Sequence, residues 1–281
     1  MNRDKSLIQL INEHLDKDLQ GLPVFNSVAV KLQQILASKD FCIDTIIQKI
    51  SEDQSLASQV LRVANSSFYA GLSKVATIKD AVVRLGAQEI ANLAMVASQH
   101  EHYKSKNPTL NKYMQELWSH ALCCAVSAKW LAQKCGYINL TQEAFMAGLL
   151  HDIGKLALLK VLDDIDRNNE TSAPFSETLI KEVMAKMHEE VGMKLMHSWL
   201  LPECYSNIAM NHHNQEFDHQ DILLVIVRLA NAACKKAGKD IMPSPEISLL
   251  TLPETQYLGI KEITLAELEI LIEDVNSGLE D

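Results

Sequence analysis

Apolar residues recur along this chain at the spacing of amphipathic α-helices. An early set occupies positions i, i+4, i+7 and i+8: Val28, Leu32, Ile35 and Leu36. The same periodicity continues through residues 43–50 and 56–64 and predicts one buried helical face in each segment. No stretch shows the alternating apolar and polar residues between turn pairs that are typical of strands. The pattern therefore predicts an all-α fold.

Polar residues mark where some of these helices begin and end. Thr77 and Asp80 have the spacing of a capping box, and Gly86 follows as a stop signal, so a short helix is predicted between them. Thr264 and Glu267 have the same spacing and predict the start of the last helix.

Two changes in composition divide the predicted helices into three segments. The stretch "HEHYKSKNPTLN" is polar and contains a proline, and a proline-containing stretch follows Gly238. We therefore expect an N-terminal helical lobe over residues 15–105, a second helical lobe over 106–238, and a loop with a C-terminal helix over 239–281.

Charge limits the classes of partner that the chain can bind. Its 281 residues carry a net charge of −10 and no basic run, which disfavours nucleic acids and membrane surfaces as partners. No run approaches the ~18 uninterrupted apolar residues of a membrane span. The N-terminus mixes charged and apolar residues at helical spacing, unlike a signal peptide. The default expectation is a cytoplasmic protein.

Histidines in the second lobe carry the candidate chemistry. His151 and Asp152 are adjacent in "GLLHDIGKLAL", and the other histidines considered as ligands are His120, His188, His212 and His213. Imidazole and carboxylate ligands together suit divalent Fe, Mn, Co, Ni or Zn. A bound ion lowers the pKa of its water and polarises a phosphoryl oxygen. The residue types therefore fit a metal site for phosphate-ester hydrolysis.

A structural interpretation stays open for each of these residues. His120 also fits a hydrogen-bonded core histidine, and Asp152 fits a residue that orients an imidazole or caps a turn near Gly154. Lys155 fits either a surface lysine at a helix end or a cation that stabilises a transferring phosphoryl group. Asp152 and Lys155 are the candidate catalytic residues.

The order of several motifs resembles that of HDOD domains, which are HD-related output domains. The motifs are "SEDQSLASQVLRVANSSFYAG", "LWSHALCCAVSAKWLA", "AGLLHDIGKLAL" and "HEEVGMKLMHSWLLPECYSNIAMNHH", and the resemblance spans roughly residues 20–235. It implies an all-α fold in which an N-terminal helical lobe packs on an HD-like helical lobe. This agrees with the periodicity.

The resemblance also implies a ligand set. Active relatives hold a metal with a first His, the HD pair and a late Asp, and His120, His151 and Asp152 match the first three. Asn231 stands where the late Asp is expected, and an amide lacks the charge that offsets a dication. The histidines that resemble those of two-metal HD-GYP relatives form a possible second site: His188, His212 and His213. The GYP sequence itself is missing, so this chain lacks the element that the resemblance associates with recognition of cyclic dinucleotides.

Two functions follow from this resemblance. The favoured one is a bacterial-type signal-transduction output or scaffold domain with degenerate or no hydrolase activity, which acts through contacts with signalling proteins. The alternative is a metal-dependent phosphohydrolase that acts on a nucleotide, a cyclic nucleotide or a phosphomonoester, so the ligand is a small phosphorylated molecule. The expected cofactor is a divalent ion (Fe, Mn, Co, Ni or Zn) or, in a degenerate domain, none.

Overall fold

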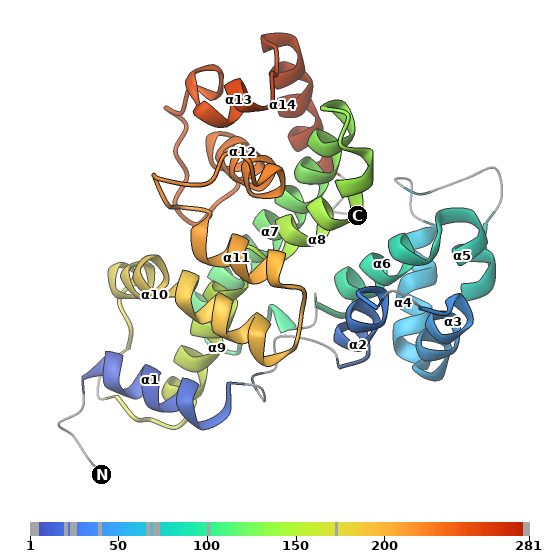
Figure 1. Ribbon diagram of the computed structural model, residues 1–281. Helices are drawn as coiled ribbons and strands as arrows, with labels where there is room; N and C mark the ends of the chain where they lie inside the picture. The colour runs from blue at the N-terminus through green and yellow to red at the C-terminus, as the bar shows by residue number, and fades with distance from the viewer. Residues whose placement is uncertain are drawn as a thin grey trace. The chain divides into compact units, whose positions relative to one another are not determined.

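The all-α fold is confirmed by a computed structural model, in which every regular element of the described residues is helical (Figure 1). It describes residues 6–19, 22, 27–38, 41–65, 69, 74–99, 102–171 and 174–277. The helices follow in the order α1 Leu7–Asp18, α2 Ser27–Leu36, α3 Ile43–Glu52, α4 Gln54–Ala64, α5 Ile78–Leu85, α6 Ala87–Gln99, α7 Pro108–Lys134, α8 Thr141–Leu150, α9 Ile153–Arg167, α10 Glu177–Ser198, α11 Glu203–Asn211, α12 Ile222–Lys236, α13 Pro253–Tyr257 and α14 Glu262–Ser277, with 3-10 turns η2 Ile138–Leu140 and η3 Leu249–Thr251.

The chain forms two compact units. The smaller unit comprises residues 23–102 and 199–202, and the larger unit comprises residues 1–22, 103–198 and 203–281. The smaller unit contains α2 to α6 and has its own apolar core, which includes Leu32, Ile46, Ile50, Val60 and Ile90. These residues lie on the helical faces that the apolar periodicity predicts.

The predicted start and end of α5 are confirmed. The Thr77 hydroxyl accepts a hydrogen bond from the Asp80 amide at 3.0 Å and donates one to the Asp80 carboxylate at 2.7 Å. Gly86 ends the helix with a φ of +86°, a conformation that favours glycine. In the same unit, the Asn65 side-chain amide donates a hydrogen bond to the Val75 carbonyl and accepts one from the Val75 amide. These two bonds hold the end of α4 next to Val75.

The predicted capping box at Thr264 is wrong. Helix α14 begins at Glu262, so Thr264 lies inside the first turn and its amide donates to the Lys261 carbonyl at 2.9 Å. Spacing alone cannot distinguish a cap from a similar pair one turn further along the helix.

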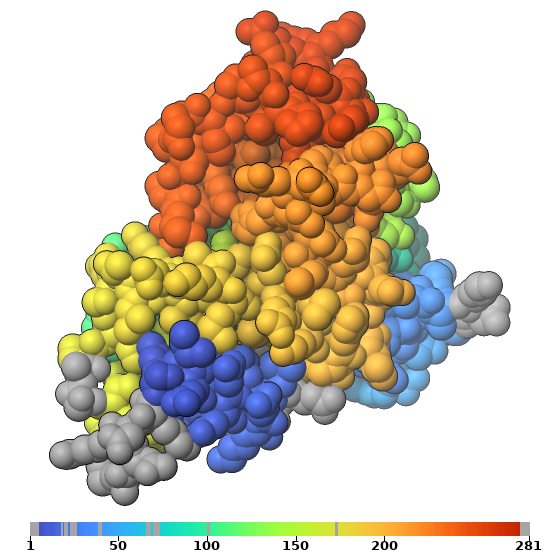
Figure 2. Space-filling model, turned by 60° about the vertical axis from the view of Figure 1, so that its left-hand side comes forward, coloured from blue at the N-terminus to red at the C-terminus, as the bar shows by residue number. Residues whose placement is uncertain are grey.

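Helix α7 is the central helix of the larger unit. It contacts α8, α12 and α14, while α10 contacts both α9 and α11. Figure 2 shows α10 and α11 side by side at the surface, with α1 (blue) next to them, and α1 contacts α9. Within the described part of the chain, no helix combines the length and the apolarity needed to cross a membrane.

Two glycines of "GLLHDIGKLAL" permit close helix contacts. A Cβ atom on Gly148 would lie 2.6 Å from the Cys124 carbonyl oxygen of α7, and one on Gly154 would lie 1.9 Å from the His188 carbonyl oxygen of α10. Any larger residue at these positions would overlap backbone atoms. The two glycines therefore allow α8 and α9 to bring His151 and Asp152 close to residues of α7 and α10.

Candidate metal centre

Four buried histidines from the larger unit converge around Asp152, which is itself buried. His120 comes from α7, His188 from α10, and His212 directly follows α11, while His151 and Asp152 occupy the break between α8 and α9. We call these five residues the histidine cluster. Each of them is at most 2% exposed. Sequence analysis predicted all five, and the structure brings them together.

Each carboxylate oxygen of Asp152 faces two imidazoles. Asp152 Oδ2 lies 3.4 Å from Nε2 of His120 and 3.4 Å from Nε2 of His151. Asp152 Oδ1 lies 3.3 Å from Nε2 of His212 and 3.5 Å from Nε2 of His188. The carboxylate therefore stands between two pairs of histidines.

Backbone carbonyls determine which nitrogen of each imidazole is protonated. All four rings bond through Nδ1 to a carbonyl oxygen: His120 to Lys239 (2.5 Å), His151 to Gly148 (2.8 Å), His188 to Met184 (2.7 Å) and His212 to Ala209 (3.0 Å). A carbonyl oxygen can only accept, so each Nδ1 donates its proton, and each Nε2 is turned toward the Asp152 carboxylate. Metal-binding histidines are oriented by this type of hydrogen bond.

Burial keeps Nε2 of His151 and of His188 free of protons. Burial lowers the pKa of His151 well below its usual value, and Asp152 opposes this effect only in part. Burial likewise lowers the pKa of His188 to about 3. Nε2 of His151 lies 3.3 Å from Nε2 of His120.

The cluster also contains buried atoms without hydrogen bonds. Among the residues that the structure describes, Oδ1 of Asp152 and the Nε2 atoms of His188 and His212 have no hydrogen-bond partner. Unpaired buried polar atoms are costly, and a divalent cation would satisfy them. The residues present therefore fit a metal of the imidazole and carboxylate class.

Lys155 is part of this centre, and its interpretation as a surface lysine is wrong. Its side chain is 2% exposed, and Nζ lies 2.6 Å from Oδ2 of Asp152. Burial alone would lower the pKa of Lys155, but the Asp152 carboxylate raises it. Burial would raise the pKa of Asp152, but the Lys155 ammonium holds it well below its usual range. The two residues form a buried ion pair.

The predicted second site is also assembled. The ligand atoms of His188, His212, His213 and Asp152 lie within 4.8 Å of one another. His213 is exposed, and its ring centroid lies 4.1 Å from that of His212. The ring of His213 therefore remains next to the cluster although the residue is exposed.

Sequence analysis missed two residues. Asp240 lies beyond α12 with a side chain 1% exposed, and its Oδ2 is 3.5 Å from Nε2 of His120. The one signal in the sequence was that Asp240 is the first acidic residue after α12. The other residue is Arg228 of α12, whose Nη1 donates to the carbonyls of His212 and Asn214 at 2.9 and 2.7 Å and so holds the turn after α11.

Asn231, the predicted replacement for the late Asp, is buried on α12. Its Oδ1 has no hydrogen-bond partner in the described part of the molecule. Its role as a ligand stays a prediction.

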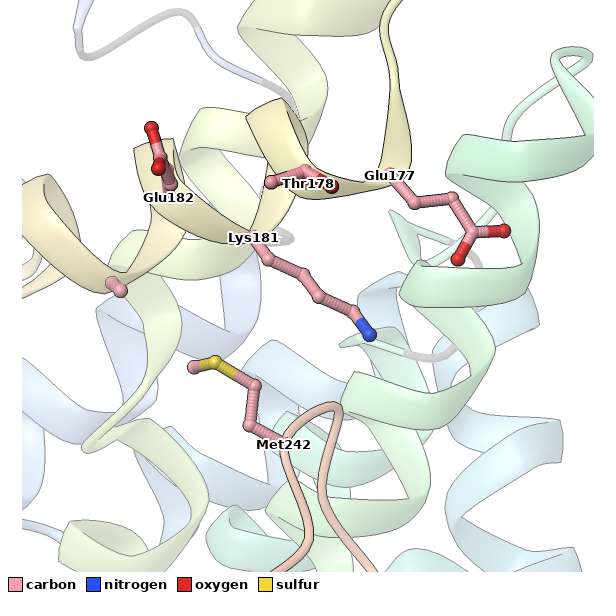
Figure 3. A pocket seen from close by; sticks show the side chains of 6 residues that line it. Glu177, Thr178, Lys181, Glu182 and Met242 are labelled. Atoms are coloured by element: carbon pink, nitrogen blue, oxygen red, sulfur yellow. The ribbon is translucent and has the colours of Figure 1, made fainter.

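A surface groove of about 310 Å³ lies along the first turns of α10 (Figure 3). Its lining consists of Glu177, Thr178, Lys181, Glu182, Ala185 and Met242, and includes no residue of the histidine cluster. One lysine beside two glutamates is a poor match for a phosphorylated ligand, since the carboxylates repel it.

Comparisons with known proteins agree with the helical architecture. The sequence model of the HDOD domain matches residues 22–215. A Treponema pallidum (strain Nichols) protein without an assigned role is 25% identical over 203 residues; the match covers 70% of this chain but only 38% of that protein.

Three solved structures share the fold. A Geobacter sulfurreducens HDOD domain protein of unknown function has a TM-score of 0.76 at 21% identity, covering 98% of this chain and 97% of that one. A Marinobacter aquaeolei protein inferred to act in signal transduction has a TM-score of 0.73 at 24% identity, covering 98% and 63%. A Shewanella amazonensis protein inferred to be a phosphohydrolase has a TM-score of 0.64 at 22% identity, covering 96% and 98%.

Proposed function

Because this chain belongs to the HDOD family, we propose that it is a bacterial-type signal-transduction output domain that acts through contacts with signalling proteins. Its histidine cluster holds a divalent metal ion as part of the fold, and hydrolase activity is degenerate or absent. The likeness to the Marinobacter protein that is inferred to act in signal transduction supports the general role.

The burial of the cluster is the observation that carries this proposal. The four imidazoles and the Asp152 carboxylate are at most 2% exposed. A catalytic metal keeps an open coordination position for water or substrate, whereas a structural metal is enclosed by protein ligands. The enclosed arrangement supports the structural role.

Lys155 supports the same conclusion. Its ammonium already neutralises the carboxylate at the centre of the cluster, so Asp152 has no free charge with which to activate a nucleophile. The side chains that would hold the ion are His120, His151 and Asp152, with His188 and His212 on the other carboxylate oxygen. When bound, such an ion can act as a Lewis acid and lower the pKa of a coordinated water.

One observation favours the alternative, a metal-dependent phosphohydrolase. His213 is exposed while its ring contacts His212, so one ligand of the second site lies at the surface. Through this side a nucleotide, a cyclic nucleotide or a phosphomonoester would reach the centre. The Shewanella neighbour inferred to be a phosphohydrolase has the same fold.

Metal analysis and phosphoesterase assays distinguish the two functions. Protein purified without chelator is loaded with Mn²⁺, Fe²⁺, Co²⁺ or Ni²⁺ and supplied with p-nitrophenyl phosphate, its diester and a cyclic dinucleotide. We expect wild-type protein to retain metal that the His151→Ala variant loses, and to hydrolyse no more ester than Asp152→Asn. Turnover that disappears in Asp152→Asn would establish the hydrolase instead, and a wild type with no more metal than His151→Ala would refute the metal centre.

A further inference from the structure

We propose that Asp240, and not Asn231, supplies the second carboxylate of the metal centre. The inference deepens the proposed function and rests on the metal centre described there. Asp240 lies nine positions after Asn231, in the loop that follows α12. Its contribution depends on how this loop returns to the histidine cluster.

The end of α12 directs the chain back toward His120. Gly238 has a φ of +75°, and the Lys239 amide donates to the Cys234 carbonyl at 2.9 Å, which is the long hydrogen bond of a Schellman motif. The Lys239 carbonyl then accepts from Nδ1 of His120 at 2.5 Å. This hydrogen bond therefore holds the loop against the His120 imidazole.

The Asp240 carboxylate has one fixed oxygen and one unpaired oxygen. Oδ1 accepts a hydrogen bond from the Met242 amide at 2.6 Å. Oδ2 is buried, makes no hydrogen bond with the described part of the chain, and faces Nε2 of His120 at 3.5 Å. The two ring nitrogens of His120 thus face consecutive residues of the same loop, Nδ1 toward Lys239 and Nε2 toward Asp240.

The position of Asp240 is close enough to two other candidate ligands for the three residues to bind one ion. Its carboxylate oxygen, an oxygen of Asp152 and a nitrogen of His120 all lie within 4.8 Å of one another. An ion bound between these three atoms would replace the missing hydrogen bond of Oδ2 and use the free lone pair of the imidazole.

Charge balance requires such a carboxylate. Lys155 neutralises Asp152, and imidazoles protonated on Nδ1 contribute ligands but no negative charge. An amide at position 231 contributes none either. Without Asp240 a dication would enter a buried site of zero net charge, which is unfavourable. Asp240 restores the charge that the family's late Asp provides.

The test is Mn²⁺ binding to the full chain, measured by equilibrium dialysis and elemental analysis. We expect Asp240→Asn to weaken Mn²⁺ binding at least about tenfold, and Asn231→Ala to retain the wild-type affinity. Asn at position 240 keeps the acceptor for the Met242 amide, so thermal unfolding in chelator should match the wild type. The rise in unfolding temperature on adding Mn²⁺ should shrink in Asp240→Asn.

Asp240→Glu provides a second variant that keeps both the charge and the acceptor, and it should bind Mn²⁺ more tightly than Asp240→Asn. Equal affinities of these two variants, or a loss of binding in Asn231→Ala alone, would overturn the inference. A wild type that binds no Mn²⁺ would overturn both the inference and the metal centre. Ester hydrolysis by the wild type would refute the signalling role and leave the assignment of Asp240 intact.

Discussion

At the scale of single residues, the buried pair of Lys155 and Asp152 controls the electrostatics of the cluster. The ammonium and the carboxylate are both at most 2% exposed and 2.6 Å apart. Removing one partner of a buried ion pair leaves the other charge uncompensated. A bound metal ion would supply such a positive charge.

Replacement of Lys155 by Met should therefore destabilise the protein by about 3–5 kcal/mol in chelator, and Mn²⁺ should restore a large part of the loss. Urea unfolding with and without Mn²⁺ measures both quantities. Lys186→Met, which removes an exposed lysine of α10, is the matched control and should change stability little. Equal effects of the two substitutions would show that the ion pair contributes nothing.

Protonation of the buried histidines should make the metal-free protein less stable in acid. The pKa of His188 is about 3 in the fold and about 6.5 in the unfolded chain. Between these values the unfolded chain binds a proton that the folded chain does not, so stability falls as pH decreases. From pH 7 to 5 the loss should be about 2 kcal/mol for this histidine.

Urea unfolding in chelator at pH 7 and pH 5 measures this loss. His188→Gln should show a smaller loss than the wild type, because glutamine does not titrate. An unchanged pH dependence in His188→Gln would mean that His188 is protonated in the folded protein.

At the scale of elements, the site depends on how closely α9 approaches α10. Gly154 lies against the His188 carbonyl, and this contact brings the start of α9, where Asp152 lies, to the helix that carries His188. The short motif "HDIG" thus contains the candidate ligand Asp152 and also Gly154, the glycine that allows the start of α9 to approach α10. Helix packing of this kind tolerates no added backbone overlap.

Gly154→Ala should cost about 3 kcal/mol or more, because the new Cβ overlaps a backbone oxygen and the two helices must separate. Thermal unfolding and metal content should both decrease. Gly192→Ala is the matched control at the same interface, because its nearest contact would be at 3.4 Å, an ordinary van der Waals distance. Comparable losses in both variants would contradict the role assigned to Gly154.

At the scale of the whole molecule, the chain forms two units with separate cores. Every residue of the histidine cluster, together with Lys155 and Asp240, belongs to the larger unit, while α2 to α6 form the smaller one. Metal binding stabilises the folded state of the segment that holds the ion, by about 2.7 kcal/mol when the free metal is 100 times its Kd.

Hydrogen exchange should therefore show a local response to Mn²⁺. Backbone amides of α7 to α12 should gain protection, and those of residues 27–38 and 74–99 should exchange as before. Asp152→Asn measured in parallel should show no gain in either unit. An equal gain throughout the wild-type chain would show that the two units unfold together.

The sequence by itself determined the helical class, the start and end of α5, and five residues of the cluster. Helical periodicity is a local property, so it predicts the buried faces confirmed in the smaller core, such as those of Leu32 and Ile50. The resemblance of ordered motifs to HDOD domains identified His120, His151 and Asp152 as one set, although they lie far apart along the chain.

Only the tertiary structure decided the state of Lys155 and the presence of Asp240 at the centre. From its position in the helix, Lys155 was interpreted as a surface lysine. In the structure it is buried, and the ion pair with Asp152 compensates the cost of burying its charge. Asp240 lies in a loop whose path depends on the left-handed turn at Gly238 and on hydrogen bonds to His120 and Met242. Residues far apart in sequence meet through helix packing, and local patterns do not specify which loop residue returns to the site.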